Sequence, residues 1–444
     1  MVSQGSVGSQ APVGKETKVR PRALGARNGL SAMALGIGLV IMSTGAAHAA
    51  TGFLSGMKVT GDLRAYDFAR LYSGTPPSQH AFSAGGGIDI LSGTVGGFSA
   101  EATFYSAHSL GLNNTNNALV DGTLAGFGRI DTFGQAFLQY HDHGLLVRAG
   151  DQLLNTPWMN PSDARVVPAT YQGLFAAFTP VAGLTVSALR ITRYKSRTSD
   201  GFSQTNLYNA VGDVNVGGTG GLGGRTEPGA AAVGVNDALG GLKTAVWAYQ
   251  FFDLAKMAYA QGSYTFGGGS IAPLIGAQYV RETGSGAQYL GRVDATAYGA
   301  IVGIKSGSDL VTVGYNDIPA HPGAFGNGDM VSPYTSGYAT DPLYTTSMIQ
   351  GLVDRKTSGH AVKVGATAFF LRHQVRLMAG FARYFNTVYA GYSAPHTDET
   401  DLDLTYFLKG SLKGLSVRDR IGVAYHLPVL SRFIYNRVMV EYDF

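Results

Sequence analysis

The stretch that decides the fold closes the chain: Val438-Met439-Val440-Glu441-Tyr442-Asp443-Phe444. Side chains alternate across a β-strand, so the apolar residues at 438, 440, 442 and 444 share one face and the two acids share the other. Apolar residues facing outward and acids facing inward are typical of a strand in a membrane-spanning barrel that holds water. The alternative is an edge strand of a soluble β-sandwich.

The N-terminal segment has the pattern of an export signal. Basic residues from Lys15 to Arg27 precede the apolar run Leu30–Met42, and Ala47-His48-Ala49 provides a small-x-small cleavage site. The apolar run is shorter than the ~20 residues that a spanning helix needs, which disfavours a membrane anchor. We therefore expect residues 1–49 to be a cleaved signal peptide and residues 50–444 to form a single barrel domain.

Composition and charge restrict the function. Five of the 33 Lys and Arg residues and one of the 29 acids lie in residues 1–49, so the mature chain holds 28 charges of each sign. A neutral mature chain gives no reason to expect nucleic-acid binding. Without Cys, the chain has neither disulfides nor thiolate chemistry. Its 63 Gly, 22 Phe and 24 Tyr are typical of a barrel built of hairpins.

Short turns alternate with longer polar stretches along the mature chain. The turns stand at 141–144, 179–183 and 267–270, and the polar stretches at 111–125, 155–170, 199–242, 281–293, 316–347 and 386–400. Short turns on one side and long loops on the other are typical of bacterial outer-membrane barrels. At about 22 residues per strand and connection, the sequence predicts an all-β, transmembrane antiparallel β-barrel of sixteen to eighteen strands with an aqueous lumen.

The predicted strand 415–425 has one irregular position. Arg418 and Arg420 oppose an apolar face that runs from Val417 to Tyr425, and Asp419 interrupts that face. Because a carboxylate that faces lipid is costly, we expect Asp419 to lie near a rim, unless the register is wrong.

No group of residues indicates catalysis, a cofactor or a metal. The Ser, His and Asp residues are scattered, and no G-x-S-x-G elbow occurs. The glycine-rich segment Gly217–Gly224 lacks the strand, the helix and the Lys-Ser/Thr pair of a phosphate loop. His141 and His143 are better explained as a solvated turn than as ligands. We expect no enzyme activity.

Cations recur at positions expected to face the lumen. Desolvating an unpaired cation costs several kcal/mol, so these residues face water or a charged partner. Rows of guanidinium groups in a narrow pore form a track for carboxylates, and the alternative is that each cation pairs with a lumen acid. In the dense group at 190–197, Arg190 has the parity opposite to that of Arg193, so a bulge intervenes or one side chain faces outward. The candidates are Arg64, Arg148, Arg376, Arg418 and Arg420, with Arg190, Arg193, Lys195 and Arg197.

Three ordered segments resemble the OprD-type substrate-specific porins. Residues 155–173, NTPWMNPSDARVVPATYQG, are similar to that family's Arg-x-x-Pro loop region. Residues 338–344, YATDPLY, resemble its Asp-Pro-Tyr-containing loop. Residues 412–420, LKGLSVRDR, resemble its Lys-Gly-Leu-Ser-x-Arg-x-Arg strand start and depart from it at Asp419. The likeness extends from Gly61 to Phe444.

The resemblance implies eighteen strands, inward-folded constriction loops and a ladder of basic residues. It places Arg165 in the inward-folded loop, Arg418 and Arg420 on the ladder, and Asp341 in a loop able to supply acidic selectivity. The expected function is passive, partly selective diffusion of small carboxylate solutes, either amino acids or aromatic and aliphatic acids. A surface-binding or adhesion barrel and a barrel hydrolase are the alternatives.

The expected location is the outer membrane of a Gram-negative cell, with lipid and lipopolysaccharide around the barrel. Phe444, with Tyr442 two residues before it, resembles the signal by which the barrel-assembly machinery recognises such proteins. The other expected partners are small carboxylate solutes and not nucleic acid. The oligomeric state is expected to be a monomer or a weak trimer.

Overall fold

The computed structural model describes residues 52–74, 76–125, 128–162, 164–209, 222–267, 269–355, 358–389, 392–427 and 431–444. All of them belong to one compact unit, Ser43–Phe444. The proposed signal peptide, Asp163 of the Arg-x-x-Pro segment and most of the glycine-rich segment 217–224 lie outside the described residues.

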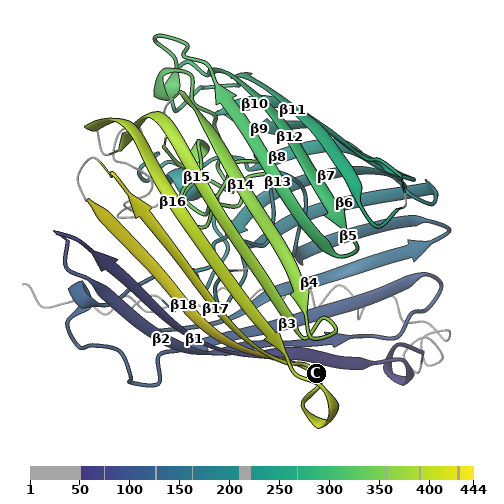
Figure 1. Cartoon of the computed structure of the whole chain (residues 1–444). Coiled ribbons are helices and arrows are strands. Elements are labelled where there is room, and N and C mark those ends of the chain that lie inside the picture. The colour runs from purple at the N-terminus through teal and green to yellow at the C-terminus, as the bar shows by residue number, and fades with distance from the viewer. Residues whose placement is uncertain are drawn as a thin grey trace, which may run out of the picture. The chain divides into compact units, whose positions relative to one another are not determined.

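The described residues form one closed antiparallel sheet of eighteen strands (Figure 1). Each strand pairs with its neighbours in sequence, and β1 also pairs with β18, which closes the barrel. The predicted fold class is therefore confirmed. The strands are β1 (Lys58–Tyr72), β2 (Gln79–Leu91), β3 (Phe98–His108), β4 (Arg129–Asp142), β5 (Leu145–Gln152), β6 (Thr170–Val181), β7 (Leu184–Lys195), β8 (Ala230–Leu239), β9 (Leu242–Phe251), β10 (Ala255–Thr265), β11 (Ala272–Gly284), β12 (Asp294–Ser306), β13 (Asp309–Ile318), β14 (Gly359–Phe370), β15 (Val375–Tyr389), β16 (Tyr392–Phe407), β17 (Leu415–Tyr425) and β18 (Arg432–Asp443).

Helical structure is limited to single turns. Residues 52–55 form one α-helical turn before β1. Among the described residues, no helix is long and apolar enough to cross a membrane. The 3₁₀ turns are η2 (Asn117–Leu119), η3 (Leu207–Asn209), η4 (Phe325–Asn327), η5 (Val353–Arg355) and η6 (Gly410–Leu412).

The C-terminal strand alternates as its sequence predicts. Val440 is 38% exposed on the outer surface, whereas Met439 is 1% exposed inside the barrel. The seam with β1 extends to the last residue, because the N–H of Gly61 donates to the Phe444 oxygen at 3.1 Å and the Phe444 N–H donates back at 3.0 Å. A Cβ at Gly61 would meet the oxygen of Gly87 at 2.4 Å, so the close approach of β1 and β2 requires glycine there.

Short turns and both described ends of the chain lie at one end of the barrel, which we call the short-turn end. Gly144 and Gly183 make tight turns there with φ values of 79° and 93°, a region that only glycine enters without strain. The longest connection, 319–358, lies at the opposite, long-loop end. The predicted turns at 141–144 and 179–183 are confirmed, and the third prediction, 267–270, falls between β10 and β11 and includes Gly268, which lies outside the described residues.

Strands extend into several of the predicted polar stretches, and furthest into two of them. The range 199–242 includes β8, whose inward positions are mostly Ala and Gly and whose outward apolar face is interrupted by Asp237, so its alternation gives little signal. The range 386–400 is mostly strand, because β15 and β16 continue as a paired hairpin toward the long-loop end. Residues that extend beyond lipid face water on both sides, so their apolar alternation disappears.

The long loops fold into the barrel and build an apolar core there. Trp158 is 1% exposed and packs edge-on against Tyr259 of β10, with ring centroids 6.1 Å apart. Tyr334 of the 319–358 loop packs on Tyr171 and Tyr194 of the wall at 5.8 and 5.3 Å. The core therefore occupies part of the lumen and narrows it.

Asp419 confirms the predicted register of β17. It faces outward, lies four residues from the short-turn end of its strand and is exposed. The Asn436 amide of β18 donates to its carboxylate at 2.7 Å, which partly satisfies the charge on the lipid-facing side.

Candidate functional site

A cavity of about 700 Å³ lies inside the barrel where the loops meet β1 and β18. Its wall contains four guanidinium groups from four separate segments. Arg70 comes from β1, Arg437 from β18, Arg165 from the 153–169 loop and Arg197 from the loop after β7. All four are between 2% and 9% exposed, so each presents only an edge to the cavity.

Arg165 is held by neutral groups. Its Nε donates to the Thr123 hydroxyl at 3.0 Å and its Nη1 to the Ala164 oxygen at 2.8 Å. Its guanidinium lies over the rings of Phe68 and Tyr435 at 4.9 and 5.7 Å. Burial, followed by repulsion from the Arg197 guanidinium, lowers the pKa of Arg165 to about 10, so the residue stays charged at neutral pH.

Asp121 is the carboxylate of this cluster. Its Oδ2 lies 3.1 Å from the Arg70 Nε, and its Oδ1 accepts from the Thr123 hydroxyl at 2.7 Å. Burial alone would raise the pKa of the Asp121 carboxyl, but attraction to Arg70 and Arg165 together with the bonds from Thr123 brings the pKa below its usual value. Asp121 is therefore ionised and offsets one of the four cations.

Arg197 and Arg437 are also held without an acid. The Arg197 Nη1 donates to the Ser162 hydroxyl at 2.7 Å, and its guanidinium lies 3.6 Å from the centre of the Tyr338 ring. Arg437 lies over the Tyr435 ring at 4.7 Å, and its Nε has no hydrogen-bond partner among the described residues. Asp354 is the second acid of the cavity wall, so four guanidinium groups and two carboxylates leave the cavity with an excess of positive charge.

Two further rows of cations continue toward the short-turn end. Arg437 stands opposite Arg420 in the β17–β18 register. One inward position further along, Arg418 and Arg376 both stand opposite Thr405 of β16. The spacing of strands in a sheet therefore places cations at successive levels of one wall.

Asp403 balances part of this lower group. Its two oxygens accept from Arg418 Nε and approach Arg420 Nε, each at 2.8 Å. Arg376 instead donates to the Thr405 hydroxyl at 3.0 Å. Glu441 also attracts Arg376 and Arg418, and Asp401 attracts Arg420, so acids of the same wall offset the charge of this lower group.

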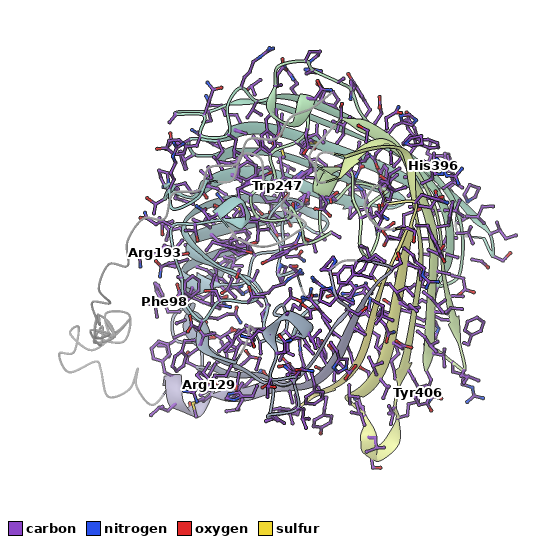
Figure 2. All side chains as sticks on the ribbon, turned by 90° about the vertical axis from the view of Figure 1, so that its left-hand side faces the viewer. Phe98, Arg129, Arg193, Trp247, His396 and Tyr406 are labelled. Atoms are coloured by element: carbon purple, nitrogen blue, oxygen red, sulfur yellow. The ribbon has the colours of Figure 1, made fainter. Side chains whose placement is uncertain are left out.

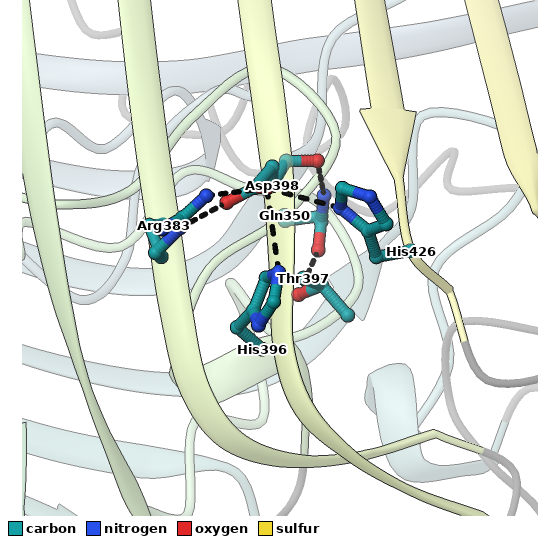
Figure 3. Close-up of polar contacts among 6 residues, drawn as sticks. All are labelled: Gln350, Arg383, His396, Thr397, Asp398 and His426. Carbon is teal, nitrogen blue, oxygen red and sulfur yellow. Dashed lines mark hydrogen bonds and ion pairs between the residues drawn. The ribbon is translucent and has the colours of Figure 1, made fainter.

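Buried carboxylates fix the 319–358 loop against the wall. The N–H of Ile349 donates to Glu399 at 2.6 Å, and the N–H of Met348 donates to Asp401 at 3.0 Å. Figure 3 shows Gln350 of the same loop, whose side chain donates to the Asp398 main-chain oxygen at 3.3 Å. These bonds position the loop that closes one side of the cavity.

The outer side of the same strand carries an ion-pair cluster. Ligand atoms of His396, Asp398 and His426 lie within 4.8 Å of one another, a spacing open to a metal ion. The Asp398 carboxylate, however, already accepts two bonds from Arg383 at 2.6 and 3.0 Å (Figure 3). A guanidinium that engages both oxygens leaves an arrangement better suited to a salt bridge than to a metal.

Some predicted path residues do not face the lumen. Arg190 stands opposite the exposed, lipid-facing Leu174, and Arg193 lies on the outside of the barrel (Figure 2). The prediction that these two cations line the path is wrong, because the register of β6 and β7 shifts between Gln172 and Gly173 and leaves Thr192 as an extra residue. The bulge gives Arg190 and Arg193 the same outward orientation.

Lys195, Asp341 and Arg148 lie inside the structure but outside the cationic rows. Lys195 is fully buried, and its Nζ donates to the oxygens of Pro168 and Ser196 at 3.1 and 3.2 Å. The Asp341 carboxylate accepts from the Leu343 N–H and the Thr346 hydroxyl within its own loop, and burial raises its pKa. Both residues therefore shape loops. Arg148 donates to Gln139 at 2.7 Å near the short-turn end of β5, away from the cavity wall.

Sequence reasoning missed Arg70, Asp121 and Arg437. The alternation of β18 contains the signal for Arg437, since it has the inward parity of Met439 and Glu441. Arg70 likewise has the parity of Arg64 on β1. No signal indicates Asp121, because only the folded loops bring it to Arg70.

Comparison with known proteins agrees with this geometry. The family model for outer membrane porins of the OprD family matches residues 132–349. The chain belongs to this family. It is accordingly an outer-membrane porin, and its short turns are periplasmic and its long loops extracellular. Among curated proteins, no sequence is significantly similar to the chain.

Solved structures share the fold of this OprD-family porin at low sequence identity. OccK9 (OpdG) from Pseudomonas aeruginosa is 18% identical with a TM-score of 0.75, over 88% of this chain and 99% of that one. OpdK from the same organism, crystallised with vanillate, is 16% identical with a TM-score of 0.70, over 88% and 100%. OccK2 (OpdF), crystallised in complex with glucuronate, is 17% identical with a TM-score of 0.71, over 88% and 99%.

Proposed function

We propose that the porin conducts small solutes that carry a carboxylate, and that the cationic rows attract them. The observation that carries this proposal is the cavity whose wall holds four guanidinium groups, of Arg70, Arg165, Arg197 and Arg437, against two carboxylates, of Asp121 and Asp354. Because these guanidinium groups are almost covered, their field is screened less than that of exposed cations. A carboxylate that enters the cavity loses part of its hydration shell, and its attraction to these guanidinium groups compensates for part of that loss.

The lower rows supply the next positions along the route. Arg420 adjoins Arg437, and Arg418 with Arg376 lies one level nearer the periplasm. A solute moves down this wall by exchanging one guanidinium for the next. Binding at each level must be weak, since a tight site would plug the channel, and Asp403 reduces the charge of the lower rows.

The ligands in two related structures support a carboxylate as the solute group. OpdK was crystallised with vanillate and OccK2 with glucuronate, and each of these compounds carries one carboxylate. One is aromatic and the other is a sugar acid, so the shared feature is the charge and not the scaffold. We infer the same class for this porin.

Planar bilayers with single inserted channels test the proposal. A gradient of KCl gives the anion-to-cation permeability ratio, and added benzoate gives solute block. We expect anion preference and benzoate block in the wild type, and loss of both in Arg165→Gln/Arg437→Gln. Lys305→Gln, at the periplasmic end of β12, is the matched control and should retain both. An unchanged permeability ratio in the double variant would refute the proposal.

A further inference from the structure

The outer face of the barrel carries a groove of about 840 Å³ across β6 to β11. Small residues form its floor. In the strand register they are direct cross-strand neighbours, each opposite the next: Val147, Ala176, Ala188, Val233, Ala248 and Ala258.

Larger residues border this floor on its periplasmic side. The adjacent outward row has the same cross-strand continuity and consists of Phe178, Val186, Val235 and Val246. Between β6 and β10 the sheet is therefore hollowed where alanine replaces larger side chains. The hollow is apolar and long enough to receive a hydrocarbon chain.

Two cations stand at the extracellular side of the floor. The next outward row runs through Arg190, Ala231, Gln250 and Lys256. Arg190 lies over the Phe252 ring at 4.5 Å and donates to the Ala230 oxygen at 3.3 Å. Within the described residues, no carboxylate forms an ion pair with Arg190 or Lys256, whereas neighbouring Arg281 pairs with Asp294 at 2.7 Å.

The height of this row coincides with the boundary of the outer leaflet. β8 and β9 have ten residues each. Ten residues at about 3.3 Å each, tilted by about 45°, rise about 23 Å, which is close to the apolar band of about 25 Å in such barrels. Gln250 and Lys256 are each one residue from the extracellular end of their strands. The cations thus lie at headgroup level and the alanines at acyl-chain level.

We propose that this groove binds one molecule of a phosphorylated, acylated glycolipid of the outer leaflet, the lipid A part of lipopolysaccharide. An acyl chain lies over the alanine floor, and a phosphate accepts from Arg190 and Lys256. A phosphate matches these cations in charge and accepts charge-assisted bonds that a neutral lipid or an apolar protein face lacks. The inference concerns the outer surface and does not depend on the solute that the pore conducts.

Native mass spectrometry of the delipidated, full-length porin in detergent tests the site, with titration by bisphosphorylated hexa-acyl lipid A. We expect one tightly retained molecule per chain. Arg190→Gln/Lys256→Gln should weaken retention at least tenfold for bisphosphorylated lipid A and little for its dephosphorylated form. Ala188→Leu/Ala248→Leu should weaken retention of both forms, because the floor is filled.

The matched control is Arg129→Gln/Arg432→Gln, which removes two outward cations at the same end of other strands. It should retain lipid A like the wild type, and all variants should keep the wild-type single-channel conductance as evidence of folding. Equal weakening in the control would show unspecific charge attraction and overturn the site. The site would also be overturned if the porin retained phosphatidylglycerol as tightly as lipid A. The same holds if Ala188→Leu/Ala248→Leu changed the oligomeric state without loss of lipid A.

Discussion

Substitution of Asp121 by Asn tests the cationic cavity in the direction opposite to removal of an arginine. Asp121 lies 3.1 Å from Arg70 and, of the two acids of the cavity wall, is the one that pairs with a guanidinium group there. Asn preserves the volume and still accepts from Thr123, but it removes one negative charge. The positive excess acting on a bound carboxylate therefore increases.

The size of the effect follows from Coulomb's law. A carboxylate bound about 5 Å from Asp121, at an effective dielectric constant of about 20 to 40, is repelled by about 1.5 to 3 kcal/mol. Loss of that repulsion strengthens binding by about tenfold or more, since about 1.4 kcal/mol corresponds to a factor of ten. Breaking the buried ion pair with Arg70 also costs about 3 to 5 kcal/mol of stability. This cost destabilises the 109–128 loop, because the closed sheet does not depend on that ion pair.

Single-channel recording in the presence of benzoate measures the outcome. In Asp121→Asn the residence time of benzoate should lengthen about tenfold, and maximal benzoate flux into liposomes should fall because exit is slower. The flux of a neutral sugar should not change. Asp131→Asn, which removes an acid from the outer face of β4, is the control and should behave as the wild type. An unchanged or shorter residence time in Asp121→Asn would refute the electrostatic reasoning.

Three further perturbations test the loops and the proposed assembly signal. Glu399→Ala removes the acceptor of the Ile349 N–H, a loss of about 1 to 3 kcal/mol, so the 319–358 loop should loosen and single-channel conductance and noise should rise. Burial raises the pKa of Glu227 from 4.5 to about 7 although the Tyr334 hydroxyl donates to its carboxyl group, so the stability that the folded segment gains from the neutral carboxyl is complete below pH 4.5 and is lost as pH rises through 7. Hydrogen exchange of the 222–229 segment should accelerate between pH 5.5 and 8.5, after correction for the intrinsic rate, and Glu227→Gln should abolish this excess. Phe444→Ala should lower the amount of barrel inserted by the assembly machinery several-fold, as measured by immunoblot of outer-membrane fractions, while refolding into detergent in vitro stays efficient.

The sequence predicts the barrel wall better than it predicts the lumen. Strict alternation makes the outward face of β18 visible from Val438 to Phe444, and it fixes the orientation of Arg418 and Arg420 on β17. The same rule fails in β7, where the extra residue Thr192 reverses parity and turns the predicted lumen residue Arg193 outward. Composition does not locate such a bulge, because one extra residue reverses the parity of a strand without changing the residue types in it.

Contacts between loops are the part of the site that a single sequence does not reveal. Asp121 and Arg165 meet through Thr123, although they come from different loops. Loop position depends on buried acceptors such as Glu399, which resembles any other lumen acid in sequence. The resemblance to OprD-type porins nevertheless identifies Arg165 as a loop residue. A motif shared with a family of known fold indicates where a residue lies in the tertiary structure, whereas periodicity indicates only the secondary structure.

The way in which the cations are held explains how residues 50–444, which have equal numbers of basic and acidic residues, can keep positive charge along the proposed solute path. Arg165 and Arg197 donate to hydroxyl groups, and both lie over aromatic rings. Arg437 lies over Tyr435, and Arg376 donates to a threonine hydroxyl. Hydroxyls and ring faces position a guanidinium without cancelling its charge, at an interaction of about 0.5 to 2 kcal/mol per ring. A carboxylate in the same place would fix the side chain equally well but would remove the field that attracts the solute.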